Sequence, residues 1–311
     1  MRMKTMRRGV LYAGAMLVVA TAAGAQQVPD SSFAPAIARP AFAEGAGPLV
    51  LVDEAHTNFH TTDGRYYAFA QLLRRDGYAV RGLRAPFTRE SLGDARVLVI
   101  ANALHASNDQ SWALPTPSAF APDEIAAVEA WVRGGGSLLL VADHMPFPGA
   151  AGDLASAFGV TMGNGFAYDS TEQGSTMRFA SGDGSLADHA VTRGRDEAER
   201  VDSVFAFTGQ AFRVAAPDAE PLMTLGRGTV LLMPDVAWQF SPTTTRVPAQ
   251  GHLQGAVLRH GRGRVAVFGE AAMFSAQLAG PNRQPMGMNN SRAPQNVQFL
   301  LNVMHWLTGV I

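Results

Sequence analysis

The chain has 311 residues with 25 basic and 26 acidic side chains, no cysteine, and a single lysine, Lys4. The absence of cysteine excludes disulfides, thiolate catalysis, iron–sulfur clusters and Cys-ligated zinc. Because the only lysine lies in the first few residues, the rest of the chain cannot form a Schiff base, attach pyridoxal phosphate or use a P-loop lysine.

Residues 1–25 have the pattern of a secretory signal peptide. Four basic residues precede the apolar segment VLYAGAMLVVATAAG, and Ala-Gly-Ala stands directly before Gln26. We therefore expect a periplasmic or secreted protein without stable membrane insertion, with a retained N-terminal anchor as the alternative. Without the signal, 21 basic and 26 acidic residues remain, a net charge of −5, so nucleic acid is not an expected partner.

After a Pro- and Ala-rich linker at 26–46, strand and helix patterns alternate through one domain, 47–311, with an irregular insert at about 164–228. Continuous apolar runs at 49–52, 97–100, 138–141 and 265–268 predict strands buried on both faces. Helical patterns cover 66–77, 122–136, 152–160 and 296–310, and glycines end the first two of them. Short crossovers of this kind predict an α/β fold with a mainly parallel sheet covered on both faces.

Polar side chains follow the ends of these strands, where ligands bind in open parallel sheets. Asp143, His144 and Glu270 are the candidate catalytic residues. The candidate ligand-binding residues are Asp53, Asn102, His105 and Trp238. The alternative is that these residues only cap helices or lie in solvated loops.

Glu54, His56 and His60 form a candidate metal set in the loop after the first strand. Their order, Glu-x-His-x-x-x-His, differs from the helical His-Glu-x-x-His motif, and loop or cap histidines are the alternative. Zinc, iron or manganese are the metals that such ligands would hold, although no cofactor is required. We interpret His305, beside Trp306 on the last helix, as a core histidine.

Two common motifs are absent. No Gly-x-Ser-x-Gly elbow is present, so the sequence does not predict an α/β-hydrolase. No Gly-x-Gly-x-x-Gly follows the first strand, so a dinucleotide site is not predicted.

The segment EIAAVEAWVRGGGSLLLVADHMPF resembles the part of class I glutamine amidotransferase-like domains that leads to their nucleophile elbow. RVAVFGEAAMFS falls where those domains carry a late strand, and LVLVDEAHTNFHTTDGRYYAFAQLL resembles the first strand and helix of exported, largely uncharacterised members. Those members are related to a domain of gliding-motility transporter auxiliaries and intraflagellar transport proteins, for which sugar binding has been suggested. The resemblance implies a flavodoxin-like, three-layer α/β sandwich and the position of the site.

The chain departs from that superfamily at its reactive residues. Asp143 or His144 occupies the neighbourhood of the elbow cysteine, and Glu270 follows a glycine with no histidine two residues before it. Glutamine hydrolysis through a thioester is therefore excluded.

Two interpretations stay open. In the first, the protein is a hydrolase of the cell envelope that acts on a glycan or a related polar substrate, with Asp143, His144, His56 and Glu54 activating water, directly or through a metal, and without covalent Cys or Lys chemistry. In the second, it is a non-catalytic carbohydrate- or ligand-binding module, in which Trp112 or Trp238 stacks on a sugar.

Overall fold

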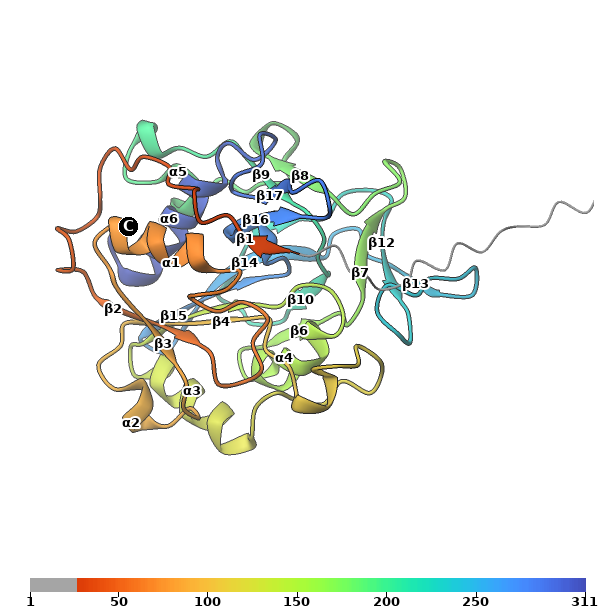
Figure 1. Cartoon of the computed structure of the whole chain (residues 1–311), viewed down its shortest axis with the longest axis horizontal. Helices are drawn as coiled ribbons and strands as arrows, with labels where there is room; N and C mark the ends of the chain where they lie inside the picture. The colour runs from red at the N-terminus through yellow and green to blue at the C-terminus, as the bar shows by residue number, and fades with distance from the viewer. Residues whose placement is uncertain (1–26) are drawn as a thin grey trace, which may run out of the picture.

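The computed structural model describes residues 27–311 (Figure 1). The expected signal peptide lies outside the described residues. Within residues 27–311, the chain forms an α/β fold around a mixed nine-stranded sheet, in the order β3-β2-β4-β5-β15-β14-β10-β6, with β11 pairing with β14. No helix among the described residues is both long enough and apolar enough to span a bilayer.

One half of the sheet is parallel, as the apolar runs predict. Its strands are β2 (Leu49–Asp53), β3 (Ala79–Leu83), β4 (Val97–Ala101), β5 (Ser137–Val141) and β15 (Gly263–Phe268). Strand β2 pairs with β3 and β4, β4 with β5, and β5 with β15, all in parallel. The prediction that these four apolar runs form parallel strands of one sheet is therefore confirmed.

The other half of the sheet is antiparallel, so the expectation of a mainly parallel sheet needs correction. It consists of β14 (Leu253–His260), β11 (Ala219–Thr224), β10 (Phe212–Val214) and β6 (Val160–Met162). Gly261 and Arg262 alone join β14 to β15, and so short a turn can connect only antiparallel neighbours. Strands β10 and β11 come from the region expected as an insert, which thus contributes to the central sheet.

Alternating residues of the parallel strands enter two cores on opposite faces. Val50 and Val52 pack in a core that includes residues of α1 (Tyr67–Arg75) and α6 (Asn296–Thr308). Leu51 packs in the other core, which includes residues of α3 (Pro122–Arg133) and α4 (Phe147–Ser156). Figure 1 shows these two helix pairs on opposite sides of the sheet. The uninterrupted apolar strands are thus explained by burial on both faces.

Three smaller sheets and several short helices complete the described chain. The small sheets are β13-β12-β7, β8-β9 and β1-β16-β17. Their strands are β7 (Phe166–Asp169), β12 (Thr229–Met233), β13 (Thr245–Pro248), β8 (Met177–Ala180), β9 (Ser203–Ala206), β1 (Val28–Pro29), β16 (Ala276–Ala279) and β17 (Gln284–Gly287); the short helices are α2 (Arg89–Leu92), α5 (Ala190–Arg193), η1 (Ala106–Asn108), η2 (Ser181–Asp183), η3 (Glu197–Glu199) and η4 (Ala272–Phe274). The β7–β12–β13 sheet lies at one end of the molecule, near β6 and β10 (Figure 1).

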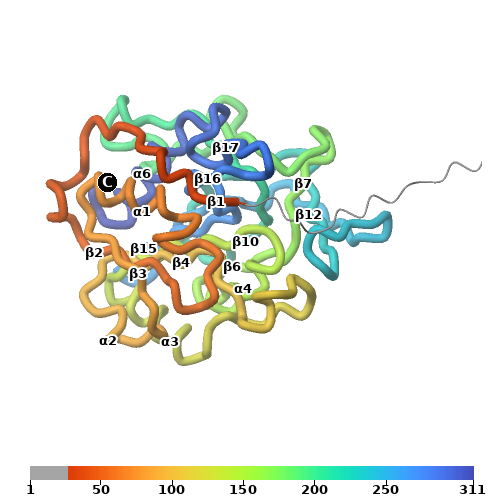
Figure 2. The backbone as a smooth tube through the Cα atoms, viewed as in Figure 1, coloured from red at the N-terminus to blue at the C-terminus, as the bar shows by residue number. Residues whose placement is uncertain are grey.

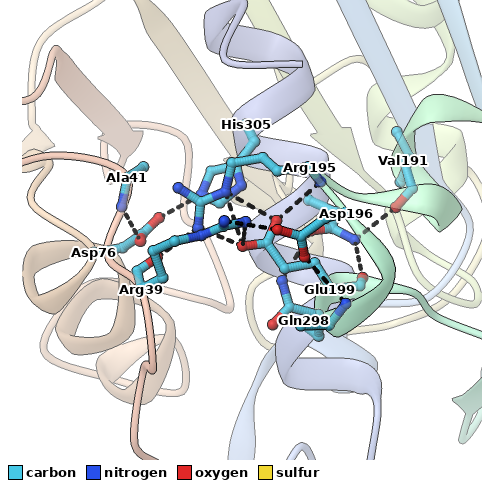
Figure 3. A network of polar contacts seen from close by, with 11 residues as sticks. Arg39, Ala41, Asp76, Val191, Arg195, Asp196, Glu199, Gln298 and His305 are labelled. Atoms are coloured by element: carbon cyan, nitrogen blue, oxygen red, sulfur yellow. Dashed lines mark hydrogen bonds and ion pairs between the residues drawn. The ribbon is translucent and has the colours of Figure 1, made fainter.

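Residues 27–47, which we call the N-terminal arm, run along the domain toward β2 (Figure 2). The arm begins with β1, which pairs with β16. Arg39 forms salt bridges with Asp196 at 2.7 Å and Glu199 at 3.0 Å. The Ala41 N–H donates to Asp76, whose other carboxylate oxygen lies 2.8 Å from His305 Nε2 (Figure 3). The segment expected as a linker is therefore fixed to the domain at several points, and His305 is a buried core histidine.

Glu199 is the central acidic residue of the contacts that fix the N-terminal arm to the domain. Burial disfavours its charged form, but the hydrogen bond from Arg195, with Nε 2.8 Å from Oε1, and the contact with Arg39 outweigh the burial and lower the pKa of Glu199 to about 2. A carboxyl group whose pKa falls on folding stabilises the folded state above its unfolded pKa, and this contribution is lost as the pH falls toward the folded pKa.

We therefore expect Glu199→Gln to lower the free energy of unfolding by about 1–3 kcal/mol at pH 7, and by much less at pH 3. Urea denaturation at both pH values measures the difference. Glu197→Gln, in the same short helix but exposed, is the control and should change little at either pH. An equal loss of unfolding free energy at pH 3 and pH 7 would show that the charge of Glu199 does not stabilise the attachment of the N-terminal arm.

Candidate active and binding site

Asn102, at the end of β4, organises the carboxyl edge of the sheet. Its backbone N–H donates to Val141 at the end of β5, and its carbonyl accepts from Phe59 in the loop after β2. Its side-chain oxygen accepts from the Asp143 N–H at 2.9 Å, and its amide nitrogen lies 3.2 Å from His60 Nδ1. Asn102 has a φ of +50°, a left-handed conformation that asparagine tolerates better than most residues. Asn102 therefore connects the ends of β4 and β5 with the loop after β2 through its backbone and its side chain.

Asp143 and Glu270 form a buried carboxyl pair beside Asn102. Asp143 accepts from the His144 N–H at 2.8 Å, while the two oxygens of Glu270 accept from the N–H groups of Ala272 and Met273 at 2.8 and 2.7 Å. Burial raises the pKa of Asp143 to about 7. Burial, and next the charge of Asp143, raise the pKa of Glu270 well above its ordinary value. Since Glu270 is 0% exposed, its side chain does not reach solvent.

The two histidines nearest this pair are neutral and have defined tautomers. His144 Nδ1 donates to the Met145 carbonyl at 2.7 Å, which leaves Nε2 unprotonated, and burial lowers the pKa of His144 to about 4. His60 has the opposite arrangement, because Nδ1 accepts from the amide of Asn102 and the proton is left on Nε2. Burial lowers the pKa of His60 well below its ordinary value, and its buried Nε2 has no partner within residues 27–311.

His56 belongs to a separate network. Its Nδ1 lies 2.8 Å from an Asp53 oxygen and its Nε2 lies 2.9 Å from Glu124 Oε1 on α3. Burial alone would lower the pKa of His56, but the hydrogen bonds with Asp53 and Glu124 outweigh it and raise this pKa. The ring packs against Phe87 and Phe120. Asp53 and His56 thus join β2 to α3, a framework role that the loop sequence does not indicate.

The expected metal set of Glu54, His56 and His60 is not assembled. Glu54 accepts from the Thr62 N–H and hydroxyl and pairs with Arg84 at 2.9 Å, while His56 and His60 have the separate partners given above. Within residues 27–311, no group of three or more His, Asp or Glu side chains could hold a metal ion. The loop histidines therefore face different neighbours and not one centre.

A cleft of about 390 Å³ opens at this edge of the sheet. Its lining residues are Glu54, Thr57, Asn58, Phe59, Thr61, Gly64, Arg65, Leu104, Asp109 and Trp112. Of the candidate catalytic residues (Asp143, His144 and Glu270) and the candidate metal set (Glu54, His56 and His60), only Glu54 lines it. The volume is in the range of small-ligand pockets.

A row of aromatic rings continues from the cleft past His144. Trp112 lies 5.3 Å from Phe59 and 5.9 Å from His144, measured between ring centroids. His144 stacks on Phe166 at 4.6 Å, and Trp238 contacts both rings, at 4.6 and 4.7 Å. The row connects Asp143 and His144 to the polar cleft, so the two parts form one extended candidate site.

Trp238 ends this row in an unusual state. It is 53% exposed and has a φ of +67°, a conformation that costs a non-glycine residue about 1–3 kcal/mol. The loop is held in place because the Ala237 N–H donates to the Trp112 carbonyl and the Leu114 N–H donates to Asp235. The fold thus fixes a large aromatic side chain in solvent beside His144.

One other sequence expectation has a clear outcome in the structure, and one residue of the cleft was not predicted. His105 accepts from the Ser107 N–H and caps a short helix, the alternative considered for such residues. Arg65, which lines the cleft, was not predicted, although its signal was a cation in the polar segment TTDGR between the first strand and the first helix.

The fold is shared with a known structure, whereas the sequence has no match. No family model matches the chain, and no curated protein matches it in sequence. The structure is similar to the mmIFT52 N-terminal domain, with 14% identity, a TM-score of 0.59, and coverage of 83% of this chain and 97% of that chain. Weaker similarity is found to the cytoplasmic protein STM3548 from Salmonella typhimurium, with 14% identity, 84% and 98% coverage and a TM-score of 0.48. A putative ThuA-like protein from Bacteroides uniformis has 12% identity, 88% and 94% coverage and a TM-score of 0.46. At these identities the likeness concerns the fold alone.

The raised pKa of Asp143 predicts a specific dependence of stability on pH. A carboxyl group whose pKa rises on folding holds its proton in the folded state at a pH where the unfolded chain has lost it, so stability falls as pH rises from about 4 through 7. We expect Asp143→Asn to reduce this fall by up to about 4 kcal/mol, because the amide does not ionise.

Urea denaturation of both proteins from pH 5 to pH 8 checks this. The variant should retain the slope that His56 and Glu270 contribute, since the raised pKa values of both act in the same direction. Parallel curves for the two proteins would mean that Asp143 is ionised in the folded state throughout this range.

Proposed function

We propose that the protein binds a carbohydrate at the carboxyl edge of its sheet. The observation that carries this proposal is Trp238, an exposed aromatic ring held at a positive φ beside His144 and Phe166. Backbone strain is concentrated at ligand sites, and an exposed indole face is a surface on which a sugar ring stacks. Phe240, which is also exposed and lies 5.1 Å from Phe166, extends this surface.

Polar groups in the cleft suit the hydroxyl groups of a sugar. Thr57, Thr61 and Asn58 line it beside Trp112. A site of this composition combines apolar faces with a few hydrogen-bonding groups, as small-molecule sites generally do. An elongated glycan would contact the aromatic row and the cleft together.

We further propose that the protein is an exported envelope protein of the class I glutamine amidotransferase-like superfamily, with a flavodoxin-like three-layer arrangement and without the nucleophilic cysteine. The signal-like residues 1–25, the helices on both faces of the sheet and the fold shared with the mmIFT52 domain support this placement. Asp143 and His144 stand in the neighbourhood of the missing cysteine.

Trp238→Ala should weaken glycan binding about tenfold or more, because a stacked aromatic contact contributes on the order of 1–2 kcal/mol. Isothermal titration calorimetry against a panel of neutral and acidic oligosaccharides measures the affinity. Val247→Ala is the control, since Val247 is exposed on β13 and lies outside the aromatic row. The thermal midpoint of Trp238→Ala should not fall. Unchanged binding of a glycan that the native protein holds would refute the stacking role.

Hydrolysis of the bound glycan is the second candidate function, and one observation favours it. His144 Nε2 is unprotonated and has no hydrogen-bond partner within residues 27–311, while Asp143 next to it has a pKa of about 7. A neutral imidazole can take a proton from water, and a carboxylic acid that is still protonated near neutral pH can donate one. Glu270 would act only through Asp143, because it is fully buried.

If the protein is a hydrolase, His144→Gln should reduce turnover at least about 100-fold, since general acid–base groups commonly contribute that much, while glycan affinity is retained. Release of reducing ends from the oligosaccharides that bind measures turnover, with His105→Gln as the control histidine outside the aromatic row. Absence of turnover by the native protein on every glycan that it binds would leave the binding module as its function. Elemental analysis for zinc, iron and manganese is the direct check on a metal.

A further inference from the structure

Arg65 is a cation in the cleft whose charge is not balanced locally. It lies directly before Tyr66 at the start of α1, and its side chain lines the cleft. Within residues 27–311 it forms no salt bridge with an acidic side chain. Its Nη1 donates to the Phe59 carbonyl at 3.3 Å, and its buried Nε has no acceptor. A charged donor removed from water without an acceptor is costly, so this arrangement needs an explanation.

The guanidinium is also held in a fixed position. Its central carbon lies 3.6 Å above the centroid of the Phe59 ring, a cation–π contact that favours a planar guanidinium over an ammonium. Burial lowers the pKa of Arg65, although an arginine keeps its proton at any physiological pH. The guanidinium is therefore charged and pre-oriented, and its Nη2 donates no hydrogen bond within residues 27–311.

The two acidic residues of the cleft do not supply the missing partner. Glu54 is engaged by the Thr62 N–H and hydroxyl and by Arg84, so its charge is already balanced. Asp109 follows the short helix η1 and accepts from the side chain of Gln110 at 2.7 Å. The free donor edge of Arg65 is left for a group from solution.

We propose that Arg65 forms an anionic subsite, so that the carbohydrate bound by this protein carries a negatively charged group, either the carboxylate of a uronic acid or a sulfate ester. A carboxylate or a sulfate accepts two parallel N–H groups of one guanidinium, a geometry that a neutral hydroxyl cannot match. This inference rests on the proposed glycan-binding function and specifies its ligand. Thr57 and Thr61 line the same cleft and can bind the neighbouring hydroxyl groups.

The aromatic row gives the ligand a direction. Trp112 belongs both to the cleft and to the row that leads to Trp238. A sugar with its charged group at Arg65 would therefore have its next rings beside Trp112 and toward His144. The charged sugar ring would occupy one end of the site, and the sugar rings that stack on the aromatic side chains would occupy the other end.

The test compares three trisaccharides of galactose-type rings by calorimetry with the purified full chain: a trigalacturonate, a sulfated galactotriose and neutral galactotriose. We expect the native protein to bind at least one acidic sugar about tenfold or more tightly than the neutral one, and this preference to weaken as salt is raised. Arg65→Gln should remove the preference and leave affinity for the neutral sugar nearly unchanged. Arg65→Lys, which keeps the charge but not the two-pronged geometry, should restore only part of it.

Arg74→Gln is the matched control, because it removes one positive charge from α1, the helix that Arg65 precedes. Arg74 donates to the Val80 carbonyl and does not line the cleft. It should keep the native preference. A preference for the carboxylated sugar over the sulfated one, or the reverse, identifies the source of the charge.

Four results would overturn the inference. Equal affinity of the native protein for acidic and neutral sugars would remove the anionic subsite while glycan binding stands. A preference for acidic sugars that persists in both Arg65 variants would show that Arg65 does not cause it. An equal loss of the preference in Arg74→Gln would show that it depends on the overall charge of the protein. Failure of all three sugars to bind would count against the glycan-binding function itself.

Discussion

The arrangement of this site depends on the side chain of Asn102. Its amide accepts from the Asp143 N–H and approaches His60, while its backbone bonds to Val141 and Phe59. These contacts connect the loop after β2 with the ends of β4 and β5, which are neighbours in the sheet. Only a short side chain with both an acceptor and a donor, in a left-handed conformation, can make them together. The tautomer of His60 and the position of Asp143 both follow from this one residue.

Desolvation then decides which polar groups carry charge. Burial favours the neutral form of four side chains at this edge. It raises the pKa values of Asp143 and Glu270 and lowers those of His144 and His60. His56 is buried as well, but it lies between two carboxylates, and its pKa moves the other way. Two histidines only four residues apart thus have opposite charge preferences, because one meets an amide and the other meets Asp53 and Glu124.

The parallel half of the sheet could be predicted from the sequence because each strand is an unbroken apolar run, the direct result of burial on two faces. The antiparallel half could not, since β6 and β10 have only three residues each, and β11 contains Glu220 and Pro221 in place of an unbroken apolar run. Gly261 in the sequence indicates the tight turn between β14 and β15, but the apolar pattern alone does not show that these two strands are antiparallel. At the site, proximity of Asp143 and Glu270 follows from adjacent strand ends, but the orientation of His56 depends on Glu124, which is 68 residues away. Side-chain direction at this range is decided by tertiary packing and has no local signature.

The polar residues of this edge divide into two groups by what they contact. Asp53, His56, Asn102 and Glu270 are buried and bind other parts of the chain, so their chemistry is spent on holding strand ends in place. Arg65 and Trp112 line the cleft, Trp238 is exposed to solvent, and Nε of Arg65 has no acceptor within residues 27–311. A side chain that is fully satisfied within the fold has nothing left with which to recognise a ligand, whereas an oriented but unsatisfied one gains free energy when the ligand arrives. We therefore assign recognition of the proposed ligand to the second group, while the first holds the strand ends in place.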